Sequence, residues 1–318
     1  MTIPVLEGKG LKKSYPVKTL LGRVRGMVQA VDGVSFALMP SEILGVVGES
    51  GCGKSTLARL ILCLEPLDGG QLFFMGREVT TQGDRDFRRM VQIVFQDPFS
   101  SLNPRMKVGT MLMEPLLVHR IFTSKAQARR EVAGLLERVG LSPQDMEKYP
   151  HQFSGGQRQR IGIARALVLN PKVVVADEPT SNLDVFVQAQ MVNLMLDLME
   201  ERGLSYIFIS HNLSLVGQIA HRIMVLYLGK VVETGPAKQL VKSPLHPYTR
   251  LLLDSVPVPD PTKAHLEKLP PLGDVPSPLN PPTGCPFHPR CPQAREICRK
   301  EEPPLRDVGG CQVACHLV

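Results

Sequence analysis

Short strand-like segments dominate the first hundred residues of the chain. In these segments apolar and polar side chains alternate, or a short apolar run is bounded by turn residues. They are residues 5–15, 28–38, 43–47, 67–79 as a hairpin, and, within 91–98, a strand that ends on Gln96. Residues 17–29 form a basic connection without a clear period, and helix-forming residues occupy 56–64. The pattern predicts a set of strands interrupted by one early helix.

A helical pattern follows from about residue 98 to residue 167. Within it, residues 125–139 form an amphipathic helix that Gly140 closes. Strands and helices then alternate again: a strand at 172–177, a helix at about 185–202 stopped by Gly203, a strand at 206–210, a short helix, and a hairpin of 223–227 with 231–234. This order predicts an α/β fold with a largely parallel sheet covered by helices, some antiparallel strands, and a helical subdomain at about 98–167.

The composition changes near Pro244, because 16 of the 28 prolines lie between that residue and the end of the chain. Proline fits neither long helices nor central strands. We therefore expect two parts, an α/β domain at 1–243 and a proline- and cysteine-rich C-terminal extension at 244–318. Within the extension, residues 257–282 are expected to form an extended linker, and residues 284–318 a small module held by cysteines.

Charge and cysteine content narrow the classes of function. A net charge of +7 suits an anionic ligand, a membrane surface or nucleic acid, and does not choose among them. No stretch approaches 18 consecutive apolar residues, and the first fifteen residues lack the apolar segment of a signal peptide. We therefore expect a cytosolic protein without a membrane-spanning helix. Five of the seven cysteines lie after residue 284, and in a cytosolic chain they favour metal binding or catalysis over disulfides.

Residues 48–55 match the phosphate-binding sequence G-x-x-x-x-G-K-[ST] without a gap. Lys54 can reach the β- and γ-phosphates of a nucleotide, and the Ser55 hydroxyl can bind Mg²⁺. In such a loop the backbone turns so that its N–H groups point at a phosphate, beside the positive end of a helix. These turns leave no room for a Cβ, and glycine, which has none, can adopt them. The loop has three glycines at such positions, Gly48, Gly51 and Gly53.

An apolar strand that ends in two carboxylates supplies the other half of such a site. Asp177 ends the strand VVVAD and would hold Mg²⁺ through water, and Glu178 would orient or polarise the water that attacks the γ-phosphate. His211 follows the strand YIFIS, at the carboxyl end where ligands gather in open α/β sheets. Tyr15 could stack on an adenine base, and an ordinary core or surface tyrosine is an equal alternative.

A second phosphate-binding turn occurs in FSGGQRQR, residues 153–160, where a serine cap and two glycines enter a helix. One chain with two such turns either binds two phosphates or shares one site with another chain.

The motifs in this order resemble those of the ATP-binding subunit of an ATP-binding-cassette (ABC) transporter. The resemblance covers about residues 5–240: GESGCGKST, Gln96, FSGGQ, VVVADEP, SNLD and His211. It implies an ABC-type P-loop ATPase core, in which residues 154–156 contact the γ-phosphate of ATP bound to the opposing chain. It also implies that Gln96 senses Mg²⁺ and couples to membrane subunits, and that Asp184 bridges the dimer.

The expected site residues can then be stated together. Glu178 and His211 are expected to support catalysis, and Ser55, Gln96 and Asp177 to surround Mg²⁺. The residues expected to bind ATP are Tyr15, Gly48, Ser50, Gly51, Gly53, Lys54, Ser55, Thr56, Gln96, Ser154, Gly155, Gly156, Gln157 and Asp184.

The tail narrows the resemblance. SPLHPYTRLLLDSVP from Ser243 and GCPFHPRCPQAREIC from Gly284 resemble the C-terminal extension of peptide-importer ATPases, and FSGGQRQRIGIARAL is more similar to the F-type than to the D-type subunit of dipeptide/oligopeptide importers. This implies a subunit that powers peptide import by ATP-driven dimer closure, peripheral to the cytoplasmic face of the inner membrane.

The implied partners are a second ABC ATPase chain in a heterodimer, two transmembrane permease subunits and an extracytoplasmic substrate-binding protein, with no nucleic acid. Two alternatives stay open: the same machinery importing nickel or another solute, and a soluble ABC ATPase that acts on nucleic acid or ribosomes.

Four cysteines in the tail are candidate metal ligands. Cys285, Cys291 and Cys298 are spaced C-x₅-C-x₆-C, and Cys315 follows after 16 further residues. Zinc ligands are usually paired as C-x₂₋₄-C, whereas iron–sulfur clusters accept varied spacings, so zinc, a cluster and unliganded thiols all stay open. The resemblance implies a [4Fe–4S] cluster, with Cys315 rather than Cys311 as the fourth ligand.

Overall fold

The computed structural model describes residues 3–18, 22–80, 84–255 and 273–318. They divide into two compact units. Unit 1 comprises residues up to 6, 38–42 and 74–207, and unit 2 comprises residues 7–37, 43–73 and 208–318. This division follows a different line from the predicted domain boundary at residue 243, which stays a prediction.

Two parallel strands pair in unit 1, β6 (Val91–Val94) and β7 (Val173–Asp177), with Val91 opposite Val173. All side chains of β7 before its final aspartate are buried. A parallel pair covered on both faces requires such a continuous apolar run, and the predicted strand is therefore confirmed.

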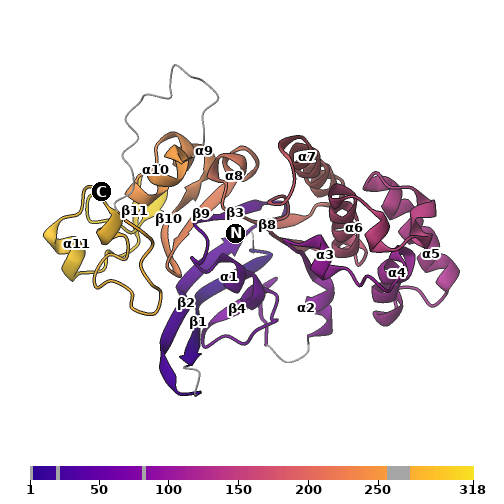
Figure 1. Cartoon of the computed structure of the whole chain (residues 1–318), viewed down its shortest axis with the longest axis horizontal. Coiled ribbons are helices and arrows are strands. Elements are labelled where there is room, and N and C mark those ends of the chain that lie inside the picture. The colour runs from indigo at the N-terminus through magenta and orange to yellow at the C-terminus, as the bar shows by residue number, and fades with distance from the viewer. Residues whose placement is uncertain (1–2, 19–21, 81–83, 256–272) are drawn as a thin grey trace. The chain divides into compact units, whose positions relative to one another are not determined.

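The rest of unit 1 is largely helical. Its helices are α2 (Arg85–Met90), α3 (Pro98–Ser101), α4 (Val108–Val118), α5 (Lys125–Arg138), α6 (Gly155–Leu167) and α7 (Val185–Arg202), with 3₁₀ turns at Pro143–Glu147 and Pro150–Gln152. Helices α4 and α5 pack side by side (Figure 1). Helices α3 to α6 fill the range predicted to be helical, whereas α2 was not predicted. The predicted strand end at Gln96 is wrong by two residues, because Asp97 caps α3 and the chain leaves β6 early.

Unit 2 contains two sheets. In the first, β2 (Val24–Leu38), β1 (Leu6–Lys18) and β4 (Gly69–Phe74) are neighbours in that order. In the second sheet the strands are neighbours in the following order: β11 (Arg306–Val308), β12 (Cys311–Val313), β10 (Lys230–Pro236), β9 (Arg222–Tyr227), β3 (Ile43–Val47) and β8 (Ser205–Ser210). Strand β3 runs parallel to β9, and β9 and β10 form the predicted antiparallel hairpin. The helices are α1 (Lys54–Ile61), α8 (Leu213–Ile219), α9 (Ala237–Lys242), α10 (Pro247–Asp254) and α11 (Glu296–Lys300).

The first two strands are longer than predicted. Strand β1 continues to Lys18 and β2 already begins at Val24, so most of the expected irregular connection is strand, with residues 19–21 outside the described part of the chain. The start of β2 is exposed or half-buried throughout, and without a fully buried face it lacks the alternation that marks a strand in sequence. The hairpin predicted at 67–79 forms as β4 and β5 (Arg77–Glu78), turning at Gly76.

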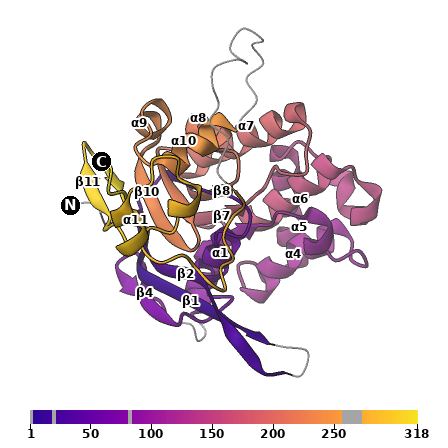
Figure 2. The same cartoon turned by 60° about the vertical axis from the view of Figure 1, so that its left-hand side comes forward.

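The last residues of the chain return to the second sheet of unit 2. Strand β12 pairs antiparallel with β10, Glu233 lying opposite Val313, and β11 pairs with β12 on its other side, which makes β11 the edge strand at the left of Figure 2. Residues 273–282 of the predicted linker are neither helix nor strand, and its remainder lies outside the described residues. Among the helices that are described, none is both long and apolar enough to cross a membrane.

Candidate functional site

The phosphate loop lies in unit 2, between the buried strand β3 and helix α1. Two of its glycines are required because other backbone comes very close. A Cβ on Gly53 (φ 105°) would lie 2.1 Å from the carbonyl oxygen of Ala30, and one on Gly48 would lie 2.3 Å from that of Leu226. Both distances are far inside van der Waals contact, so no other residue fits without a shift of the backbone. Neighbouring strands thus hold the loop in the shape that leads into α1.

The side chain of Lys54, the first residue of α1, folds back over this loop. Its Nζ donates hydrogen bonds to the carbonyl oxygens of Gly48 (2.7 Å) and Glu49 (3.0 Å), and the residue is 5% exposed. The ammonium group therefore lies at the same loop whose N–H groups and helix end attract anions. Ser55 and Thr56 continue the first turn of α1. The loop can hold a polyphosphate with backbone donors, one cation and hydroxyl groups.

Two further predicted residues belong to unit 2. Tyr15 lies on β1 with its ring half-buried, and its hydroxyl donates a hydrogen bond to the Glu65 carboxylate. Burial, and then that hydrogen bond, raises the pKa of Tyr15. Stacking of Tyr15 on adenine stays a prediction. His211 is exposed directly after β8, the neighbour of β3, so His211 and the phosphate loop follow adjacent strands.

In unit 1 the predicted carboxylates lie at the end of β7, and the structure brings Glu178 together with Gln96. Asp177 is the last residue of β7, and the Gln96 Nε2 donates a hydrogen bond to Glu178 Oε2 at 3.2 Å. Glu178 has a φ of 45°, a left-handed conformation that residues with a Cβ rarely adopt. The hydroxyl and N–H of Ser181 both donate to its carbonyl oxygen, at 3.1 and 3.3 Å. The backbone after β7 is thus held in an unfavourable conformation that fixes where the Glu178 carboxylate points.

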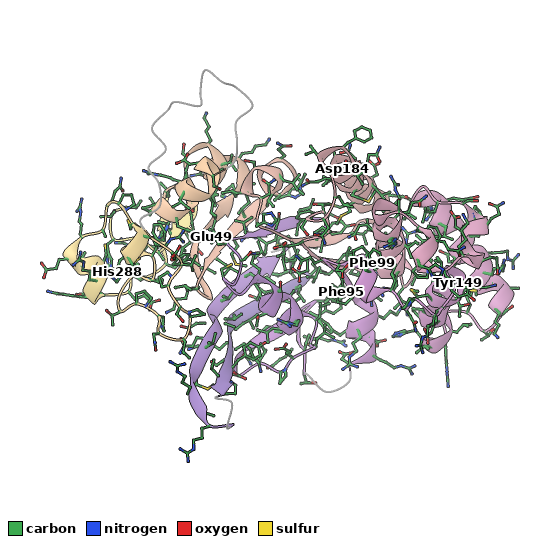
Figure 3. All side chains as sticks on the ribbon, in the orientation of Figure 1. Glu49, Phe95, Phe99, Tyr149, Asp184 and His288 are labelled. Carbon is green, nitrogen blue, oxygen red and sulfur yellow. The ribbon has the colours of Figure 1, made fainter. Side chains whose placement is uncertain are left out.

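The predicted serine cap at the second turn is confirmed. Ser154 is the N-cap of α6: its Oγ accepts from the Gln157 N–H at 3.3 Å, and its own N–H donates to Gln157 Oε1 at 3.0 Å. Behind the turn, Arg158 donates twice to the Phe153 carbonyl and places its guanidinium 3.5 Å from the ring centroid of Phe99, which Figure 3 labels. The turn is rigid although it lies at the surface.

Asp184 lies close to this turn within unit 1. A Cβ on Gly156 would lie 2.9 Å from the Val187 side chain, and Asp184, labelled in Figure 3, caps α7 by accepting from the Val187 N–H at 2.9 Å. Ser154, Gly155, Gln157 and Asp184 are all exposed. Val185 and Phe186 beside them are 83% and 72% exposed. A large apolar pair beside anion-binding groups is typical of a surface that meets another protein.

The cysteine segment, residues 285–315, contains the four predicted ligands, whose thiols influence one another electrostatically, and a fifth cysteine, Cys311, which is not part of that group. Burial, and then the thiols of Cys298, Cys315 and Cys291, raise the pKa of Cys285 to about 11. Cys291 lies within electrostatic range of Cys315 and Cys298, and Cys315 within that of Cys298, whereas Cys311 is within range of Glu233 and Asp307. All of these cysteines are free thiols.

Convergence of the four thiols does not by itself make a metal site. Across the residues that the structure describes, no group of three or more His, Cys, Asp or Glu side chains is arranged to hold a metal ion. The predicted metal site at Cys285, Cys291, Cys298 and Cys315 is therefore not confirmed.

Sequence reasoning missed one contact to the phosphate loop. The Glu49 carboxylate forms a two-point ion pair with Arg290, which lies next to Cys291. The two residues are 241 positions apart, so no local pattern could have paired them. The one hint in the sequence was the glutamate itself, because a negative charge inside an anion-binding loop calls for a positively charged partner.

Both parts of the chain match known sequence families. Residues 31–181 match the family described as ABC transporter, and residues 232–298 match the oligopeptide/dipeptide transporter, C-terminal region. The di/tripeptide transport ATP-binding protein DppF of Pseudomonas aeruginosa is 50% identical over 317 residues, covering 98% of this chain and 97% of that protein. The oligopeptide transport ATP-binding protein AppF of Bacillus subtilis is 48% identical over 320 residues, covering 98% and 97%. Among solved structures, the dimeric ATP-binding cassette MJ0796 with ADP and phosphate has a TM-score of 0.65 at 28% identity, covering 73% of this chain and 99% of that chain.

Proposed function

We propose, from the premise that this chain belongs to the ATP-binding subunits of ABC transporters of the oligopeptide/dipeptide type, that it powers the import of short peptides. The chain is an ATPase with the ABC-type P-loop fold, as expected. Both named relatives are F subunits, which confirms the predicted subunit type. The observation that carries the peptide assignment is the near full-length likeness to them, which includes the C-terminal region.

ATP would be held by the loop at 48–56. Backbone N–H groups and the start of α1 would face the phosphates, and Lys54, which lies at this loop, would bring a positive charge to them. The predicted Mg²⁺ residues Ser55, Gln96 and Asp177 offer a hydroxyl, an amide and a carboxylate oxygen, the donor set that this hard cation prefers. When bound, the cation neutralises charge on the β- and γ-phosphates. Glu178 would orient the attacking water, with Gln96 fixing the position of its carboxylate.

The opposing chain is proposed to be a second ABC ATPase, in a heterodimer. Ser154, Gly155, Gln157 and Asp184 are exposed and Gly156 is half-buried, and the hydrogen bonds within the chain fix their geometry without covering them. A rigid Ser-Gly-Gly turn at a helix N-terminus can close on a γ-phosphate presented by a partner. Removal of that phosphate by hydrolysis would then release the two chains.

The remaining partners are proposed from the family. They would be two transmembrane permease subunits and a substrate-binding protein outside the membrane, and this chain would be a peripheral subunit at the cytoplasmic face. Import of nickel or another solute by the same machinery remains the alternative. Action on nucleic acid or ribosomes is disfavoured, because it would not need the C-terminal region of a peptide transporter.

Residues 244–318 are proposed to be an extension to an α/β domain at 1–243, and to hold a [4Fe–4S] cluster through Cys285, Cys291, Cys298 and Cys315. Four buried or half-buried thiols that act on one another electrostatically support the ligand set. Zinc fits less well. Zinc ligands are usually paired as C-x₂₋₄-C, and the spacings C-x₅-C and C-x₆-C in this chain are wider.

Growth tests the cargo. A strain that lacks the gene, requires one amino acid and receives it only as a dipeptide is expected not to grow, and the restored gene is expected to rescue growth. The same strain given the free amino acid is the control and is expected to grow. Rescue of nickel-dependent growth without rescue on any peptide would contradict the peptide assignment.

A further inference from the structure

The second residue of the phosphate loop, Glu49, is held at both its side chain and its backbone by residues from the end of the chain. Arg290 Nη1 lies 2.6 Å from Glu49 Oε2, and Nη2 lies 3.0 Å from Oε1, so the guanidinium and carboxylate meet edge to edge. The backbone N–H of Glu49 donates to the Tyr248 hydroxyl at 2.8 Å. Arg290 is 4% exposed and Tyr248 is fully buried. Two-point, charge-assisted pairs of this kind are about twice as strong as neutral hydrogen bonds and define a direction.

Both partners of Glu49 are fixed by packing. Tyr248 lies in a cluster of aromatic rings, with centroids 4.6 Å from Tyr227 and 5.4 Å from Phe287, and Tyr227 lies 5.3 Å from Phe287. Each of the three rings is at most 1% exposed. The Arg290 guanidinium lies 5.9 Å from the Phe287 centroid. Groups ordered in advance lose little further entropy when they hold a neighbour.

The ties matter because they act on Glu49, which lies between the two glycines that neighbouring strands hold, Gly48 and Gly53. A loop that is ordered at this position before binding loses less entropy and binds its ligand more tightly. Both backbone polar groups of Glu49 are hydrogen-bonded: its N–H donates to the Tyr248 hydroxyl, and its carbonyl accepts from Lys54. Fixing Glu49 therefore also fixes an acceptor of Lys54, the cation of the loop.

Charge supplies a second reason. A carboxylate within a phosphate-binding loop repels an incoming polyphosphate unless a cation neutralises it. The side chain of Arg290 is 5% exposed, and its contact with Glu49 supplies that cation at the loop itself. Without Arg290, an unpaired and partly buried carboxylate would face the ligand.

We propose that Arg290 and Tyr248 are positioning residues for ATP, which set the affinity of the phosphate loop by fixing Glu49 and neutralising its charge. Neither residue touches ATP in this account, and both act through Glu49. The C-terminal part of the chain would then determine nucleotide affinity, a role beyond the assembly of a peptide importer. The inference rests on ATP being the ligand of the phosphate loop and is independent of the cargo.

The test is ATP binding by the full-length chain, measured by displacement of a fluorescent ATP analogue. Arg290→Gln is expected to raise the dissociation constant for ATP by roughly 5- to 150-fold, the usual range for coupled sites. The double variant Glu49→Gln with Arg290→Gln is expected to recover most of that affinity, since it removes the unpaired charge. A purely structural role for Arg290 would not give this recovery. In the assembled transporter, KM for ATP is expected to rise in the single variant while kcat changes little.

Glu296→Gln is the matched control. It removes an exposed ion pair within the same C-terminal segment, between Glu296 and Lys300 at 2.6 Å, and is expected to leave ATP affinity unchanged. Tyr248→Phe removes only the hydroxyl and provides a second variant if Arg290→Gln does not fold; it is expected to weaken ATP binding several-fold. Wild-type affinity in folded Arg290→Gln, or in Tyr248→Phe if only that variant folds, would overturn the inference. A wild-type chain that binds no ATP would overturn the nucleotide site itself, and the inference with it.

Discussion

At the scale of single residues, Glu178 combines an unfavourable backbone with a defined partner. Its φ of 45° costs free energy, on the order of 1–3 kcal/mol for a residue with a Cβ. Such a cost persists only where the surroundings enforce it, and here Ser181 holds the carbonyl while Gln96 holds the carboxylate. The geometry therefore favours a role for this carboxylate over the alternative of a solvated strand end.

Glu178→Gln is expected to leave ATP binding intact and to lower ATP hydrolysis by roughly 100-fold or more, as for loss of a general base. Glutamine has nearly the same shape, so the contact with Gln96 can persist while the charge that polarises water is lost. Phosphate release and ATP retention in the assembled transporter measure the two effects. The exposed Glu200→Gln in α7 is the control. Hydrolysis at the wild-type rate in Glu178→Gln would remove Glu178 from its assigned role.

The residue-scale predictions of local structure are confirmed where they concern neighbouring positions in sequence. They are the loop at 48–55 between a strand and a helix, the Ser154 cap, and the strand that ends just before Glu178. The ligand-binding and catalytic roles of these residues stay predictions. The contact between Glu178 and Gln96 was not stated beforehand, and the one between Glu49 and Arg290 could not have been. Both join distant positions whose proximity depends on how the chain returns on itself.

At the scale of elements, α10 begins with an unusual cap. Its N-cap is His246, whose Nδ1 accepts the Tyr248 N–H at 3.0 Å. Its own N–H and that of Leu245 donate to the buried Glu233 carboxylate, at 2.9 Å each. Burial lowers the pKa of His246 to about 3, since a charged ring cannot be solvated there. The cap requires a neutral ring, because protonation at Nδ1 would remove the acceptor.

Stability is therefore expected to fall in mild acid. A histidine with a folded pKa of about 3 and an unfolded pKa near 6.5 binds protons preferentially when unfolded. Its contribution is complete above about pH 6.5 and is lost progressively as the pH falls toward 3. Thermal unfolding at pH 7 and pH 5 measures the slope. In His246→Asn, a good N-cap that does not titrate, the drop between the two pH values is expected to be smaller. The exposed His151→Asn is the control, and an unchanged slope in His246→Asn would contradict the assignment.

Element prediction worked best for segments with one clear face. Helix α5 was expected at 125–139 and spans Lys125–Arg138, because its apolar residues repeat at helical spacing and Gly140 ends it. Strands β11 and β12 were missed, since three residues carry no measurable period. Their place beside β10 depends on a long-range pairing that the local sequence does not encode.

At the scale of the whole molecule, the motifs are distributed between the two units. Unit 2 carries the phosphate loop, His211 and the cysteine segment, and unit 1 carries Gln96, the two carboxylates and the Ser-Gly-Gly turn. The cysteine segment shares its unit with the phosphate loop, and Arg290 lies one residue before Cys291. A change at Cys291 would thus occur one residue away from the contact between Arg290 and the phosphate loop.

A metal test at Cys291 follows from this arrangement. Chain purified without oxygen is expected to be brown and to contain iron and sulfide in nearly equal amounts, as a [4Fe–4S] cluster requires. Cys291→Ser is expected to lose the colour and the iron and to unfold at a lower temperature, because the ligand set then lacks one thiolate. Cys311→Ser is the matched control, because it removes a buried thiol from the same segment. The Cys311 thiol is within electrostatic range of Glu233 and Asp307 and not of the other four cysteines, so the iron is expected to remain. Zinc in place of iron would favour the alternative metal, and wild-type chain without metal would leave the four cysteines as unliganded thiols.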